Sequence, residues 1–231
     1  MKRIILLATL IFSACQGKTF ISQSQTAELA TSTQSQTAAL QTVAPEMLIS
    51  TRGIGKAKLG MTLKSLKQVS SGDTDFELMP SFLEGVDAIA VSQKGLIQYY
   101  ILYDIEDNSE SDSMAAIEDR TITALMTSND NYQTEHGVKV GTPIKEAEDI
   151  YGNAVLAYNT EGASREYITF GNKNPDNIKF IASYFKLISD GLGFSGIYPE
   201  YPGVSYVTDK YHDDAAIAVI EVACNSDDCI N

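Results

Sequence analysis

Residues 53–69 have the sequence GIGKAKLGMTLKSLKQV, and residues 136–152 have the related sequence HGVKVGTPIKEAEDIYG. When Gly60 is aligned with Gly141, apolar residues match apolar residues along both stretches. The aligned apolar pairs are Leu59 with Val140, Leu63 with Ile144, Leu66 with Ala147 and Val69 with Ile150, and Lys64 matches Lys145. A pattern that recurs within one chain indicates an internal structural repeat.

Each stretch predicts a glycine turn followed by a short helix. Glycine adopts turn conformations that other residues resist. Thr62 and Thr142 stand where an N-cap belongs, and Pro143 follows at the first helical position, where proline is favoured. Gly152 is placed to end the second helix. Apolar residues spaced three apart form one face of each helix, so we expect both helices to cover a sheet.

The helices are expected over 62–70 and 142–151, and strand signals follow each of them. Runs of β-branched and aromatic residues predict the strands. These runs are 97–103, 122–126, 167–170, 178–185 and 216–222. We therefore expect an α+β fold of two tandem units, about 50–130 and 131–231, each a short helix plus antiparallel strands. The Gly-, Pro- and Tyr-rich segment 188–211 is too irregular for one regular element.

The repeated pattern resembles uncharacterised secreted bacterial proteins with two helix-plus-sheet repeats. The motif residues are Gly53, Gly55, Gly60, Thr134, Gly137, Gly141, Tyr151 and Gly152. In shape these proteins are similar to the β-lactamase-inhibitor-protein-like fold, also found in small outer-membrane assembly lipoproteins. The resemblance covers roughly residues 50–222 and implies a fold. Two known members of that wider fold bind other proteins, but no residue of either binding surface matches here, so no activity is implied.

The N-terminus has the features of a secretion signal. Lys2 and Arg3 precede the apolar run 4–12, which is too short to span a bilayer. The tetrad that follows, Phe12-Ser13-Ala14-Cys15, resembles the lipobox of bacterial lipoproteins, with Phe where Leu is usual. The resemblance implies that 1–14 are removed and that Cys15 receives a lipid anchor. An ordinary signal peptide is the alternative, but Phe12 suits its cleavage site poorly.

Residues 15–45 predict a tether, and 46–231 predict a globular domain. The tether is rich in Ser, Thr, Gln and Ala, so it cannot bury enough apolar surface to fold. Such a spacer would hold a domain clear of the membrane. The residue after Cys15 is Gln16 and not Asp, which by the sorting rule of this family favours the outer membrane, facing the periplasm.

The composition excludes some partners. Seventeen basic and thirty acidic residues give a net charge of −13, which repels nucleic-acid phosphates and anionic headgroups. The expected membrane contact is therefore the Cys15 lipid. In an oxidising compartment, Cys224 and Cys229 are expected to form a disulfide. A metal site is the alternative, but no histidine accompanies these cysteines: the two in the chain, His136 and His212, stand alone.

No motif for catalysis, a cofactor or a metal emerges from the sequence. GIGKAKLG lacks the spacing of a dinucleotide fingerprint and the Ser or Thr of a phosphate loop. Neither histidine has a nucleophile that sequence would place beside it, and no G-x-S-x-G is present. The acidic segment 104–113 offers oxygen ligands that calcium could use, but its spacing is not that of an EF-hand, and a solvated loop explains it more simply.

Four tyrosines in the irregular segment form a candidate binding surface: Tyr198, Tyr201, Tyr206 and Tyr211. Tyrosine gives a large contact area with a polar tip, which suits recognition, although packing of these rings between the loop and the sheet is the simpler explanation. We expect a non-catalytic envelope lipoprotein that binds a protein or a cell-wall component. The alternative is an exported hydrolase of an unrecognised type.

Overall fold

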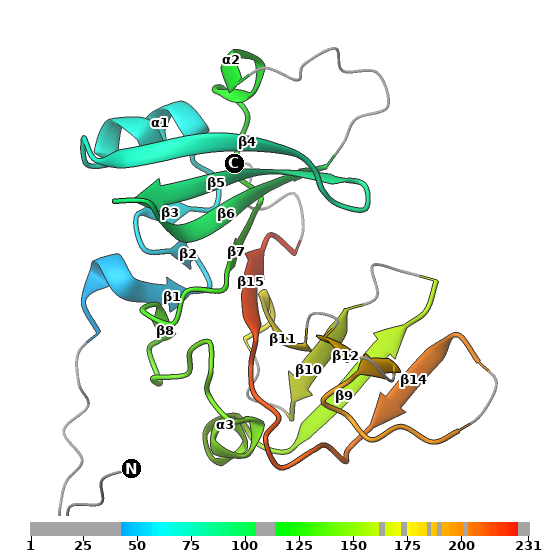
Figure 1. Cartoon of the computed structure of the whole chain (residues 1–231). Helices are drawn as coiled ribbons and strands as arrows, with labels where there is room; N and C mark the ends of the chain where they lie inside the picture. Colours follow the sequence, from blue (N-terminus) through cyan, green and yellow to red (C-terminus); the bar gives the residue numbers. More distant parts are fainter. Residues whose placement is uncertain are drawn as a thin grey trace, which may run out of the picture. The chain divides into compact units, whose positions relative to one another are not determined.

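The computed structural model describes residues 43–104, 114–161, 165–171, 175–183, 186–188, 191–200 and 203–225. All of them belong to the compact unit Gln41–Asn231, which is distinct from Met1–Leu40. The signal peptide, Cys15 and most of the tether therefore lie outside the described residues, and so do Tyr201, Cys229 and 105–113 of the acidic segment. The described part has an α+β fold in which strands predominate (Figure 1).

Strands far apart in the chain join in one large sheet. Within the described residues this sheet has nine strands, and every neighbouring pair is antiparallel. One half of the sheet has the order β15-β11-β10-β9-β14 and the other has β7-β6-β5-β4, and β7 pairs with β15 in the middle. The bounds are β4 Thr74–Leu83, β5 Val86–Gln93, β6 Leu96–Asp104, β7 Ala124–Thr127, β9 Ala154–Asn159, β10 Glu166–Phe170, β11 Ile178–Ser183, β14 Ser205–Thr208 and β15 Val219–Ala223.

Both helices expected from the sequence are present. Helix α1 spans Leu63–Val69, and the Thr62 side chain accepts a hydrogen bond from the Ser65 amide, as predicted. Helix α3 spans Ile144–Tyr151 and ends at Gly152. The cap predicted for α3 is wrong. Pro143 is the N-cap, with no side-chain hydrogen bond, because the Thr142 hydroxyl accepts from the Lys139 amide instead.

The glycine before each helix is bonded to the chain just before a central strand. Gly60 and Gly141 have φ values of 85° and 84°, the positive values that glycine permits. The Gly60 amide donates to Ile122, whose amide donates to Met61. The Gly141 amide donates to Ile217, whose amide donates to the Thr142 carbonyl in the same way. Ile122 precedes β7 and Ile217 precedes β15, so each helix is tied to one central strand.

A smaller sheet completes the fold. Its strand order is β3-β2-β1-β8, with bounds β1 Leu48–Ser50, β2 Gly53–Ile54, β3 Ala57–Lys58 and β8 Gln133–Thr134. Residues of this sheet, of both helices and of one face of the large sheet form one hydrophobic core. The opposite face of the large sheet has a second cluster around Ala88, Met126 and Ile181. The short elements are η1 Pro45–Met47, α2 Met114–Ile117, β12 Lys186–Ile188 and β13 Gly191–Gly193.

Each of the five predicted strands has a counterpart, with shifted ends. The runs 97–103 and 167–170 correspond closely to β6 and β10. The last strand begins at Val219 and not at residue 216, because Ala216 bridges Pro143 at the start of α3. The predictions omitted β4, β5, β9 and β14.

Candidate ligand-binding pocket

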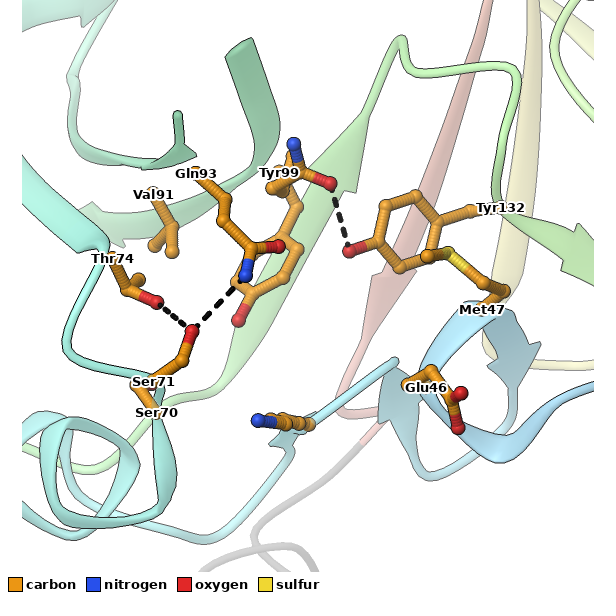
Figure 2. Close-up of a pocket in the computed structure, with 11 residues that line it drawn as sticks. Glu46, Met47, Ser70, Ser71, Thr74, Val91, Gln93, Tyr99 and Tyr132 are labelled. Carbon is orange, nitrogen blue, oxygen red and sulfur yellow. Dashed lines mark hydrogen bonds between the residues drawn. The ribbon is translucent and has the colours of Figure 1, made fainter. Parts of the chain in front are cut away.

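A pocket with a volume of about 160 Å³ lies between the small sheet and strands β5 and β6 (Figure 2). Its walls come from η1, the β2–β3 turn, the α1–β4 connection and the segment before β8. Gly55 allows these parts to meet: a Cβ there would lie 2.7 Å from the Glu46 carbonyl oxygen and 3.0 Å from the Tyr132 ring. A larger residue at this position would push η1 or Tyr132 away from the turn.

Two buried tyrosines line the pocket. Tyr99 and Tyr132 are each 5% exposed, and their rings meet edge to face with centroids 6.0 Å apart. Tyr132 donates to Gln98 Oε1 at 3.3 Å. The Tyr99 hydroxyl, by contrast, forms none of the hydrogen bonds between the pocket residues in Figure 2. Burial raises the pKa of both phenols, so each stays a neutral group that can donate and accept.

Neutral polar side chains form another wall, and they are already held in place by each other. Gln93 Nε2 donates to the Ser71 hydroxyl at 3.0 Å and to Asp73 at 3.2 Å. Ser71 and Thr74 share a hydrogen bond of 3.0 Å between their hydroxyls. These bonds fix the position of the Gln93 side chain. This wall of the pocket is therefore ordered without a bound ligand.

One acidic and one basic side chain line the pocket. Glu46 and Lys56 are exposed, and neither side chain forms an ion pair or hydrogen bond within the described part of the chain. Because both charges are solvated, they contribute little to selectivity for a charged ligand. The interior of the pocket is therefore neutral and polar, with apolar surface from Val91 and the tyrosine rings.

Tyr198 and Tyr206, predicted as parts of a binding surface, belong to an aromatic stack. Tyr158 on β9 lies between Phe194, with ring centroids 4.0 Å apart, and Tyr206, at 4.7 Å. Tyr198 meets Tyr158 edge to face. The Tyr198 hydroxyl donates to the fully buried Glu166 at 2.8 Å. The contacts favour loop packing for Tyr198, while Tyr206 is half-exposed on the edge strand β14.

The other predicted residues lie apart from the pocket. Tyr211 donates to Glu148 on α3 at 2.8 Å, and burial together with this hydrogen bond raises the pKa of Tyr211 to about 12. His136 packs edge to face on Tyr151, and His212 is exposed in the connection before β15. Among the described residues, no three His, Cys, Asp or Glu side chains are grouped to hold a metal.

The predicted disulfide and lipid anchor involve cysteines outside the described part of the chain. Cys224 directly follows β15, and its amide donates to the Thr123 carbonyl. Cys229 and Cys15 lie outside the described residues, so the Cys224–Cys229 disulfide and the Cys15 anchor stay predictions.

A buried ion pair lies on the face of the large sheet opposite the helices. Arg165 Nη1 is 3.2 Å from Glu221 on β15, and both side chains are less than a tenth exposed. Lys179 on β11 reaches the other oxygen of Glu221 at 2.8 Å. Glu221 is thus committed to two cations of the protein, which gives this group a structural role.

The pocket residues were not predicted as a site. Tyr99 was placed within a predicted strand, but nothing in the sequence marks which side it faces. The sequence contains part of a signal for the site. Tyr99, Ile101 and Tyr103 alternate along β6 and therefore share one face of the strand, and a buried tyrosine hydroxyl usually needs a hydrogen-bond partner. Ser71, Gln93 and Tyr132 gave no such signal.

No protein-family model matches this chain, and no curated protein matches its sequence. Among solved structures, the chain is similar to the crystal structure of the uncharacterized protein yfeY from Escherichia coli. The two share 14% sequence identity with a TM-score of 0.43, over 77% of this chain and 99% of the other.

Proposed function

We propose that this chain is a non-catalytic lipoprotein of the bacterial cell envelope that binds a cell-wall component or a protein partner, with the pocket as its contact site. The observation that supports this most is the Tyr99 hydroxyl, which is accessible from the pocket and has no hydrogen-bond partner among the described residues, while the side chain as a whole is 5% exposed. A ligand that forms a hydrogen bond with this hydroxyl would gain affinity from it.

The anchor belongs to the same proposal. The signal-like residues 1–14 and the lipobox-like tetrad support a lipid on Cys15, and 15–45 would be the tether. Gln16 supports the outer membrane, with the domain facing the periplasm. Within the described residues, no helix is both long and apolar enough to cross a membrane.

The finer fold proposal is that the domain consists of two copies of one unit. The paired bonds at Gly60–Ile122 and Gly141–Ile217 support it, since they recur at aligned positions. In the pairing of β7 with β15, Leu125 faces Val222, and Thr127 faces Ile220. If Ile122 corresponds to Ile217, these two pairs exchange under a local twofold rotation, which passes through the pair Met126–Glu221.

The experiment that tests the binding proposal is co-sedimentation of the full-length protein, solubilised in detergent, with purified cell-wall sacculi. In parallel, photo-crosslinking groups at positions 46 and 56, on the pocket, would capture partners in intact cells, with the exposed position 200 as a control. Retention on sacculi, or one reproducible adduct confined to positions 46 and 56, is the expected result. Neither retention nor a specific adduct would overturn the proposal.

A further inference from the structure

We infer that the pocket takes one sugar ring of a glycan, an inference that rests on the proposed function and names its ligand class. The size of the pocket supports this ligand class. Pockets that enclose drug-sized ligands measure about 300–1,000 Å³, whereas this one measures about 160 Å³. Such a volume suits a single ring-sized group. Glu46 and Lys56 line the pocket and are exposed, so the pocket is open to solvent there and the rest of a longer ligand could extend out of it.

The chemistry of the pocket lining supports the same ligand class. The hydroxyls of Tyr99 and Tyr132 are neutral, and each can donate and accept, as can every hydroxyl of a sugar. The rings of the same tyrosines and Val91 provide the apolar surface on which the C–H face of a sugar ring packs. A purely apolar ligand would leave the Tyr99 hydroxyl unpaired, which costs free energy. A phosphate would meet a single solvated lysine opposite a glutamate.

The two proposed units differ in the side chains at the positions that line the pocket. The alignment of Gly60 with Gly141 places Ser70 opposite Tyr151. In the second unit the Tyr151 ring is 2% exposed and fills the core against Phe170 and Phe180. In the first unit Ser70, with its much smaller side chain, lines the pocket.

Strand pairing extends this comparison to two more positions. Ile101 pairs with Leu125 on β7, and Phe180 pairs with Ile220 at the equivalent position on β15, so Ile101 corresponds to Phe180. Counting along the paired strands from these residues, Val91 in the first unit corresponds to Phe170 in the second, and Tyr99 corresponds to Ile178. The first unit thus has smaller residues at two positions and a hydroxyl at the third. All three differences open the pocket or make it more polar, which is expected of a ligand site and not of a packing defect.

The test measures binding of glycan strands, prepared from peptidoglycan with the stem peptides removed, to the full-length protein by titration calorimetry. Tyr99→Phe should weaken binding about tenfold, the effect of one lost hydrogen bond of about 1.4 kcal/mol. Tyr103→Phe is the matched control, because Tyr103 lies on the same strand but does not line the pocket. It should leave the affinity within about twofold of the wild type.

A second variant fills the pocket. Ser70→Tyr combined with Val91→Phe copies the packing of the second unit, and it should abolish binding while the protein still melts cooperatively. If this variant does not fold, the comparison of Tyr99→Phe with Tyr103→Phe decides alone. Wild-type protein that binds intact sacculi but not the stripped glycan would overturn the sugar inference and leave the proposed function standing, as would equal affinities for wild type and Tyr99→Phe. Absence of any wall or partner binding would overturn both.

Discussion

Removal of the Glu166 carboxylate should release the segment that contains Ser195 and Gly196. Glu166 is fully buried, and it accepts hydrogen bonds from the amides of Ser195 and Gly196 at 2.8 and 2.7 Å and from the Tyr198 hydroxyl at 2.8 Å. A hydrogen bond to a charged group contributes about 1.5 kcal/mol or more, so three contribute roughly 4.5 kcal/mol. Relief of the carboxylate desolvation offsets part of this. We therefore expect Glu166→Ala to lower the free energy of unfolding by about 3 kcal/mol.

Two measurements separate global from local effects. Urea denaturation gives the free energy of unfolding, and hydrogen exchange reports the amides of Ser195 and Gly196, which should lose protection first. Glu166→Gln should have a smaller effect, because its amide keeps one acceptor oxygen. Some loss remains, because the amide nitrogen points a donor at another donor. Glu200→Ala, at an exposed position, is the control and should change little. A loss below 1 kcal/mol for Glu166→Ala, with protection of both amides unchanged, would refute the assigned role of Glu166.

Three further predictions concern other parts of the chain. Cys15→Ser should abolish labelling by a fatty acid, and equal labelling of both proteins would contradict the anchor. Peptide mapping without reductant should find Cys224 joined to Cys229, whereas alkylatable thiols at both would exclude the disulfide. Burial raises the pKa of Tyr103 to about 12, above the ordinary value of about 10, so the native state keeps a proton that the unfolded chain loses. The free energy of unfolding should therefore be insensitive to this group below pH 10 and fall between pH 10 and 12. Urea titrations at pH 9 and 11.5 check this. An equal fall in the free energy of unfolding of wild type and Tyr103→Phe between these pH values would rule it out.

The sequence predicted the helices well because their signals are local. The glycine, the Thr62 cap and the apolar spacing of α1 lie within a few residues of each other. The missed hairpin of β4 and β5 has no such signal, since β4 contains Pro80 and the two charged residues Asp75 and Glu77. Proline is tolerated there because β4 is the edge strand of the sheet, a position that depends on the whole fold.

The candidate pocket could not be predicted for a related reason. Its residues come from segments between Glu46 and Tyr132, and only the packing of the small sheet on β5 and β6 brings them together. The tyrosines of 188–211 form a candidate surface in the sequence because they lie close together along the chain. Tyr198 instead packs on Tyr158 of β9, a residue outside that segment. Closeness in sequence was thus a poor guide to which tyrosines remain available to a partner.

The central pairing of β7 with β15 has a consequence for how the chain is made. Leu125 on β7 pairs with Val222 on β15, and the two lie almost a hundred residues apart in the chain. Strand β7 therefore gains its second neighbouring strand only after β15 has been synthesised. During synthesis from the N-terminus, β4 to β7 can assemble early and would leave β7 as an open sheet edge until β15 emerges. Open edges recruit strands from other chains, and pairings so distant in sequence form slowly. Nascent chains that stop short of Val219 are therefore expected to aggregate through β7. Strand β15 thus protects the half of the sheet formed by β4 to β7 from pairing with other chains.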